Sequence, residues 1–129
     1  MILLIDSSTP TFTVTVVDGE HKRCHFSWEA GRELARNILT YLNEALASSE
    51  ATWDDIIGIG VFEGPGSFTG LRIGITVVNT IAQANSVAIV GARGEAWQDQ
   101  ALNKLAAGEH QQVIMPYYGS EAHITSPRK

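Results

Sequence analysis

The sequence contains one cysteine and no long apolar run, and each of these shortages excludes a class of protein. Cys24 stands alone, so no disulfide can form within the chain, which fits a reducing compartment. The longest apolar runs are too short to cross a bilayer, and no basic segment precedes the apolar residues 2–5, as a secretion signal would require. We therefore expect a cytoplasmic protein without membrane attachment.

Positive charge is also scarce in this chain. It carries 9 lysines and arginines against 14 aspartates and glutamates, which gives a formal net charge of −5. Contacts to phosphate require a basic patch, and none is visible, so we expect no strong direct binding to nucleic acid. Hydrophobic residues make up 44% and charged residues 18% of the 129 residues, a balance that predicts one packed domain.

The apolar patterns predict an α/β domain with a mixed five-stranded sheet and helices on both of its faces. Residues 2–5 are apolar throughout, as in a central strand, whereas residues 11–16 alternate and are followed by the hairpin signal Asp18-Gly19. A third strand around Cys24 to Trp28 completes an antiparallel meander, after which helices and strands alternate as in a parallel sheet. The later segments are expected to be a helix over 32–47, a strand over 56–62, a helix over 71–84, a strand over 87–90, a helix over 94–107 and a final hairpin of strands 112–118 and 122–125.

A glycine-rich turn between the fourth strand and the second long helix is the most informative motif. It reads Gly64-Pro65-Gly66-Ser67-Phe68-Thr69-Gly70-Leu71-Arg72-Ile73-Gly74. Glycine permits a close approach of backbone, and Ser67 or Thr69 can cap the helix, whose free N–H groups favour an anion or a docked backbone. The turn matches neither a Walker A loop nor a nucleophile elbow, and its third glycine comes one residue late for a dinucleotide fingerprint. A capped turn without ligand and a binding role both stay open.

Other polar residues are weaker candidates for a metal or catalytic site. His21 and His25 would share a strand face but stand roughly 13 Å apart, too far for one metal ion. Asp54-Asp55 has the position of solvated turn residues. Asp6 follows the central strand, where open α/β sheets place ligands, but it has no acidic partner at a matching spacing. We expect no metal site and no catalytic residue.

Both middle helices carry a wider apolar arc than one sheet face requires. The first spans roughly 160° when its residues are placed at 100° each, and the second has two apolar rows. Either the two helices cover each other or part of this surface is an intermolecular interface. The residues we assign to a candidate interface are Ala35, Leu39, Leu42, Leu46, Ile73, Val77 and Ile81.

The start of the chain, Met1 to Pro10, and the glycine-rich turn together resemble the TsaB (YeaZ) family. The resemblance covers about the first 107 residues and implies an actin-like ATPase (ribonuclease H-like) fold. It implies a non-catalytic subunit in the biosynthesis of threonylcarbamoyladenosine on transfer RNA, paired through these two helices with a TsaD-like transferase and acting with a TsaE-like ATPase. It also implies a homodimer in the absence of partners, and no cofactor except ATP in complex with them.

The resemblance assigns two sets of residues to sites. A signature turn for docking an anion or a partner contains Gly64, Pro65, Gly66, Ser67, Phe68, Thr69, Gly70 and Arg72. A vestigial nucleotide site contains Asp6, Ser7, Ser8 and Thr9.

The sequence departs from the family pattern at two places. Gly31-Arg32-Glu33-Leu34 replaces the usual His-Ser pair near the first helix, and Pro116-Tyr117-Tyr118 replaces the usual Asp-Ala-Arg. We expect an actin-like subdomain over residues 1–110, and a short hairpin and tail over 111–129 as the remnant of a second subdomain. With one lobe, the chain is not expected to hydrolyse ATP by itself.

Two rival functions remain open. In one, Gly64, Gly66 and Gly70 wrap a pyrophosphate and Arg93 accepts a ribose phosphate, which would make the chain a nucleotide-binding enzyme domain. In the other, the same helix surface forms a homodimer that has no role in RNA modification.

Overall fold

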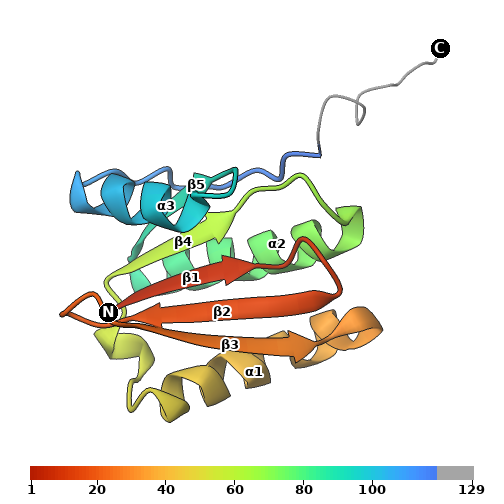
Figure 1. Ribbon diagram of the computed structural model, residues 1–129, viewed down its shortest axis with the longest axis horizontal. Helices are drawn as coiled ribbons and strands as arrows, with labels where there is room; N and C mark the ends of the chain where they lie inside the picture. Colours follow the sequence, from red (N-terminus) through yellow and green to blue (C-terminus); the bar gives the residue numbers. More distant parts are fainter. Residues whose placement is uncertain (119–129) are drawn as a thin grey trace.

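The computed structural model describes residues 1–118 of the chain. The fold is one five-stranded mixed sheet with helices on both faces (Figure 1), as the sequence predicts. Its strands are β1 (Ile2–Asp6), β2 (Thr11–Val17), β3 (Arg23–Glu29), β4 (Gly58–Phe62) and β5 (Ala88–Ala92). Its α-helices are α1 (Leu34–Ser48), α2 (Phe68–Asn85) and α3 (Trp97–Ala106), and two short 3-10 helices are η1 (Gly31–Glu33) and η2 (Trp53–Asp55).

The strand order is β3-β2-β1-β4-β5, with β1 at the centre. β1 pairs antiparallel with β2 and parallel with β4, β2 pairs antiparallel with β3, and β4 pairs parallel with β5. The meander and the parallel half therefore meet at β1. Apolar side chains on both faces of β1 are buried, which explains why its sequence has no alternation.

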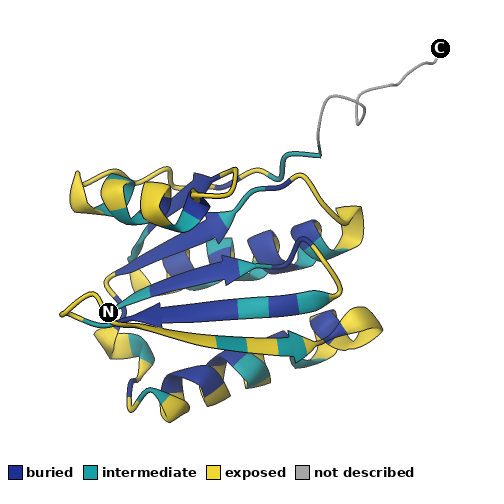
Figure 2. Cartoon of the chain, in the orientation of Figure 1, coloured by how far each residue is buried: buried dark blue, intermediate teal, exposed yellow. Residues whose placement is uncertain are grey.

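Two apolar clusters cover the two faces of the sheet. The larger one joins one face to α1 and α2, with Leu3, Ile5 and Phe12 fully buried in it. The smaller one joins the other face to α3 through Leu4, Val90 and Ala101. Figure 2 shows that β1, β2 and β4 are mostly buried, whereas β3 is mostly exposed.

The element boundaries differ slightly from the prediction. Helix α2 begins at Phe68, before the expected Leu71, because Ser67 is its N-cap and its Oγ accepts from Gly70 N at 3.2 Å. Strand β4 begins at Gly58 because the preceding residues pass through η2, where Asp55 and Thr52 form a capping box. Asp55 is thus a turn residue, as expected for it.

The expected strand over 112–118 is wrong. Residues 109–118 form no strand and run as an irregular segment beside β5 and α2, which we call the strap. The strap does not continue a β ladder because its side chains occupy the edge of β5. His110 Nδ1 accepts from Ile89 N at 3.1 Å, and Gln111 Oε1 accepts from Gly91 N at 2.7 Å. The second expected strand, 122–125, lies outside the described residues.

Within residues 1–118, no helix has the length and apolar character that a bilayer-spanning helix needs. The same part of the chain contains no group of three or more His, Cys, Asp or Glu side chains suited to a metal ion.

Candidate functional site

The glycine-rich turn follows β4 and lies against the turn that follows β1. Both turns belong to the end of the sheet where the parallel strands β1 and β4 finish. Ser67 N donates to Ser8 O at 2.7 Å, and Ser7 Oγ donates to Gly70 O at 2.8 Å. Ser7 and Ser8 are buried, with 0% and 6% exposure. The structure therefore brings the predicted signature turn together with the predicted vestigial site, residues 6–9.

Three glycines of this region are required by that contact. A Cβ on Gly66 would lie 2.5 Å from Ser8 Cβ, and a Cβ on Gly70 would lie 2.4 Å from Ser7 O. A Cβ on Gly74 would lie 2.6 Å from Ser7 Cβ. Such distances do not occur between real atoms, so each position must be glycine while the two turns are in contact. The glycines thus accommodate the backbone and side chains of Ser7 and Ser8, and a further binding role of the turn stays a prediction.

Gly64 has a different neighbour. Its φ is +124°, and a Cβ there would overlap Tyr117 O in the strap. Tyr117 N also donates to Glu63 O at 2.7 Å. The strap thus closes the other side of the glycine-rich turn. The strap and the β1–β2 turn thus contact Gly64, Gly66 and Gly70, whereas Ser67, Thr69 and Gly70 also border a pocket of about 380 Å³.

Asp6 is used to hold its own turn. One carboxylate oxygen, Oδ1, accepts from Ser8 N at 2.8 Å and from Ser8 Oγ at 2.6 Å. Thr9 is exposed, and its Oγ1 donates to Thr11 O. A shallow pocket of about 380 Å³ lies beside this turn, between Thr9, Arg32 and Thr69. Its wall from Gly31 and Arg32 is the place where the sequence departs from the family pattern.

Arg93, which one rival function assigns to a ribose phosphate, is already paired. Its Nε lies 2.9 Å from Glu63 Oε1, and its guanidinium carbon lies 3.7 Å from the centre of the Tyr117 ring. Glu63 in turn covers Gly91, where a Cβ would meet the carboxylate. Arg93 therefore contacts the strap through Tyr117 and is held in place by Glu63.

Helices α1 and α2 pack side by side on one face of the sheet and leave part of their apolar surface free. A groove of about 350 Å³ lies between them, lined by Ala35, Thr69, Arg72, Ile73, Thr76 and Val77. Leu39 is 52% exposed, and Ala35 is exposed as well. Ile73, Val77 and Ile81 are half-buried and reach both the core and the surface. We call Ala35, Leu39, Ile73, Val77 and Ile81 the helix face.

Two residues expected in this interface are not available to a partner. Leu42 and Leu46 are 0% and 2% exposed and lie in the larger core cluster. Their assignment to an interface is wrong because they lie on the side of α1 that faces the sheet, together with Leu34 and Ile38. Most of the wide apolar arc of α1 is thus covered by the chain itself.

Phe68 and Arg72 extend the helix face toward the strap. Phe68 is 54% exposed, with the Arg72 guanidinium carbon 5.1 Å from its ring centre and the Tyr118 ring 4.6 Å away. In the strap itself, Val113 and Met115 are 59% and 70% exposed. Exposed apolar groups therefore continue from the α1–α2 groove along α2.

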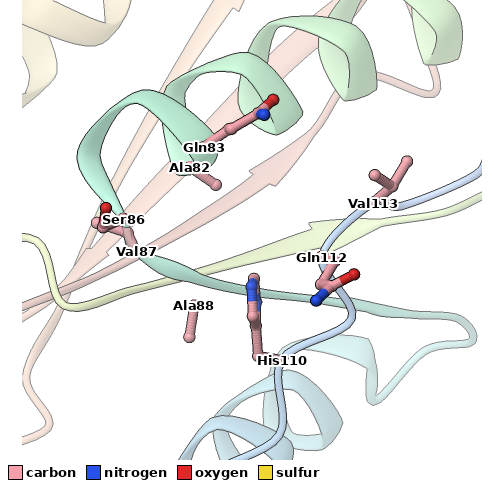
Figure 3. A pocket seen from close by; sticks show the side chains of 8 residues that line it. All are labelled: Ala82, Gln83, Ser86, Val87, Ala88, His110, Gln112 and Val113. Carbon is pink, nitrogen blue, oxygen red and sulfur yellow. The ribbon is translucent and has the colours of Figure 1, made fainter.

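A further pocket lies away from the glycine-rich turn, where α2 ends and β5 begins. It has a volume of about 610 Å³ and is lined by Gln83, Ser86, His110, Gln112 and apolar neighbours (Figure 3). Within residues 1–118, no Asp, Glu, Lys or Arg side chain lines it. It arises where the strap crosses the end of α2, and none of its residues was singled out from the sequence.

Sequence reasoning also missed Asn79, the residue that fixes the strap to α2. Its Nδ2 donates to Ile114 O at 3.0 Å, and its Oδ1 accepts from Ile114 N at 2.9 Å. Ile114 is 1% exposed, so both of its backbone groups depend on this side chain. An asparagine among apolar rows of a helix was the available signal, since a half-buried amide needs partners.

Two side chains have shifted acidities. Backbone N–H groups of Lys22 and Glu20 donate to Asp18 Oδ1 and lower the pKa of that carboxyl below its usual value. Burial raises the pKa of the Tyr41 hydroxyl, with a smaller contribution from Glu44. Tyr41 stacks on Trp28 at 5.1 Å. Both shifts belong to structural contacts of the fold.

Comparison with known proteins finds the same family that the glycine-rich motif resembles. A family model described as "TsaD: tRNA N6-adenosine threonylcarbamoyltransferase" matches residues 28–93. TsaB from Escherichia coli, a "tRNA threonylcarbamoyladenosine biosynthesis protein", is 32% identical over 90 residues, which are 70% of this chain and 38% of that protein. A tRNA N6-adenosine threonylcarbamoyltransferase from Bacillus thuringiensis is 39% identical over 62 residues, which are 48% of this chain and 18% of that protein.

Solved structures support the fold. YeaZ from Pseudomonas aeruginosa superposes with a TM-score of 0.67 at 25% identity, over 77% of this chain and 49% of that one. A second structure, described as "an uncharacterized protein with similarity to peptidase YEAZ from Pseudomonas aeruginosa", gives a TM-score of 0.68 at 20% identity, over 99% of this chain and 70% of that one. The chain spans less than half the length of the curated relatives named above.

Proposed function

The chain belongs to the family of TsaD-like proteins and is similar within it to TsaB (YeaZ), and from this membership we propose that it acts as a non-catalytic subunit in threonylcarbamoyladenosine biosynthesis on transfer RNA. Its homology to this tRNA-modification family is the basis for assigning it to this pathway. The role within the pathway is our inference. The partner we propose is a TsaD-like transferase that docks on the helix face, with a TsaE-like ATPase as a further component and ATP bound only in the complex.

The single observation that best supports a binding role is the composition of the helix face. Leu39 and Ala35 are exposed on α1, while Ile73 and Val77 border the groove on α2. Exposed apolar groups gathered around a groove on two helices are typical of an interface with another protein. A related transferase with similar helices would present the same kind of surface.

The internal contacts of the glycine-rich turn support the proposal that the chain does not catalyse a reaction by itself. Atoms of Ser7, Ser8 and Tyr117 lie against its glycines. Arg93 forms an ion pair with Glu63. Asp6, the best carboxylate candidate, is held by Ser8. A nucleotide-binding enzyme that used these residues would first have to break several internal contacts.

The test is co-purification of the chain with the TsaD-like transferase of the same cell, followed by the mass of the complex in solution. We expect a stable heteromer. The variant Leu39→Asp should weaken it by about 3 kcal/mol, because an unpaired charge would be buried at the interface. Asn103→Asp is the matched control, since it adds one charge to an exposed position of α3 on the opposite face.

Three results would contradict the proposal. A clean homodimer with no heteromer would favour self-pairing without a role in the complex. An unchanged affinity for Leu39→Asp, with the fold intact, would move the interface away from the helix face. ATP hydrolysis by the purified chain alone, at an enzyme-like rate that survives further purification, would favour a nucleotide-binding enzyme.

A further inference from the structure

The two edge strands of the sheet, β5 and β3, differ in whether another segment covers them. At the β5 edge, the strap supplies partners for the outermost strand: His110 Nδ1 and Gln111 Oε1 accept from the N–H groups of Ile89 and Gly91, and Gln111 N donates to Ile89 O at 2.8 Å. Two of these contacts use side chains and one is a single backbone hydrogen bond, so they satisfy the edge of β5 although the strap forms no strand. An edge covered in this way cannot accept a further strand.

The β3 edge has no such cover within residues 1–118. β3 is the outermost strand, and in this part of the chain it pairs with β2 alone. It is seven residues long, it pairs with β2 in unbroken register from Arg23 to Glu29, and it contains neither proline nor glycine. Figure 1 shows it as a long, straight outer arrow, and Cys24 on it is exposed. The usual devices that blunt an edge, a bulge, a proline or a very short strand, are missing from this strand.

The charges on β3 are self-complementary. The strand reads Arg23-Cys24-His25-Phe26-Ser27-Trp28-Glu29, with opposite charges at its two ends and Phe26 at its centre. If two copies of β3 pair antiparallel about Phe26, Arg23 of each copy lies opposite Glu29 of the other. The strand has no other Asp, Glu, Lys or Arg, so this register pairs neither two carboxylates nor two Lys or Arg side chains.

Both charged groups retain capacity for such a contact. Arg23 Nη2 binds Asp99 at 2.6 Å and Nη1 donates to Gln98, which uses part of its five N–H donors. Glu29 accepts from Thr11 through Oε2, which leaves Oε1. Their internal contacts hold both side chains in place on one face of the strand, so pairing would cost little side-chain freedom.

We propose that β3 is a docking edge for a second copy of this chain, which pairs antiparallel about Phe26 and continues the sheet across a twofold axis. The axis runs perpendicular to the sheet and sets α1 of both copies on the same face. This surface is separate from the helix face and does not depend on the proposed function. Since a single pair of seven-residue strands buries little area, the association is weak and transient.

Register-specific disulfide trapping tests this arrangement. In the proposed register, position 25 of one copy lies opposite position 27 of the other, and Cα atoms of opposite residues are about 4.5–5.5 Å apart, within the range for a disulfide. Positions 25 and 25 of the two copies are diagonal, about 7–8 Å apart, and cannot be bridged. His25 and Ser27 are both exposed; His25→Cys removes the 2.8 Å contact of His25 Nδ1 with the buried Thr15 Oγ1, which still accepts from Gln98 Nε2 at 3.1 Å.

The experiment uses two versions of the chain, both with Cys24→Ser, one with His25→Cys and one with Ser27→Cys, differing in a mass tag. Mixed at about 100 µM, a concentration suited to a weak interface, they are oxidised and the covalent dimers are counted by mass spectrometry. We expect the mixed disulfide to exceed either single-variant dimer by about tenfold, because only opposite positions meet the distance for a disulfide. No excess of the mixed species, with folding confirmed by circular dichroism, overturns the proposal.

A charge exchange gives an independent test in the same trapping assay. Arg23→Glu and Glu29→Arg should each reduce the mixed disulfide severalfold, since each creates like-charge pairs at both ends. The double variant should restore it, whereas the internal bond of Arg23 to Asp99 would stay broken. Glu95→Arg is the matched control for Glu29→Arg, because Glu95 is exposed and lies outside the strand. A double variant no better than the single ones overturns the twofold register.

Discussion

Replacing Gly74 by alanine tests the docking of the two turns, because two effects of the substitution have opposite signs. Gly74 lies inside α2, where alanine is more stable than glycine by about 1 kcal/mol. Helix propensity alone therefore predicts a stabilised protein. The new Cβ would, however, lie 2.6 Å from Ser7 Cβ and even closer to Ser7 Oγ.

The magnitude follows from what can move. The Ser7 hydroxyl can rotate, at the loss of its hydrogen bond to Gly70 O, but Ser7 Cβ is fixed to a buried backbone. Overpacking of this kind costs about 1–3 kcal/mol, and the upper part of that range applies here. After the gain in helix propensity, we expect a net loss of about 1–2 kcal/mol, or a melting temperature lower by roughly 3–8 °C.

Thermal and urea unfolding of three variants decide the question. Gly74→Ala should be destabilised, whereas Gly74→Ala combined with Ser7→Gly should recover relative to Ser7→Gly alone, with a coupling of about 2 kcal/mol. Gly19→Ala is the control, because a Cβ there meets nothing within 4 Å. If Gly74→Ala stabilises the protein by about 1 kcal/mol, the two turns are not docked as described and the explanation of the glycines fails.

Two further predictions concern the strap and the Asp18 turn. Asn79→Ala should destabilise the protein by about 2–3 kcal/mol and speed hydrogen exchange at Ile114, because two buried backbone groups lose their partner. Asn85→Ala is the control and should have neither effect, because it breaks only a bond to its own helix. Equal effects in both variants would contradict this role of Asn79. The lowered pKa of Asp18 means that its stabilising contribution is present above the ordinary carboxyl pKa and is lost as the pH falls through the lowered value. Asp18→Asn should therefore flatten the acid side of a plot of urea midpoint against pH, and parallel curves would refute the assignment.

The sheet and the order of its elements could be predicted from the sequence because their signals are periodic. Alternation in Thr11–Val17 marks a half-buried strand, and the uninterrupted apolar residues 2–5 of β1 mark a central one. The glycine-rich turn stands out in the sequence as the most informative motif, but the pattern cannot say what its glycines contact. That answer depends on Ser7 and Ser8, which are far away along the chain.

The strap, and the burial of two of the seven assigned interface residues, could not be predicted for physical reasons. The strap is held by Asn79, His110 and Gln111 through side chain to backbone contacts, which leave no periodic trace. Its apolar residues therefore looked like a strand. In α1, a wide apolar arc cannot say which part faces the sheet, so Leu42 and the exposed Leu39 were grouped together. Only the placement of the helix separates them.

The central position of β1 has a consequence for how the chain folds. Ile2 pairs with Val17 on one side and with Gly58 on the other, so one neighbour comes from the adjacent hairpin and the other arrives after α1 has formed its crossover. Closing the short loop costs less entropy than closing the long one. The meander thus has the smaller closure cost, whereas the pairing of β4 with β1, which also completes the contact between the two turns, has the larger one.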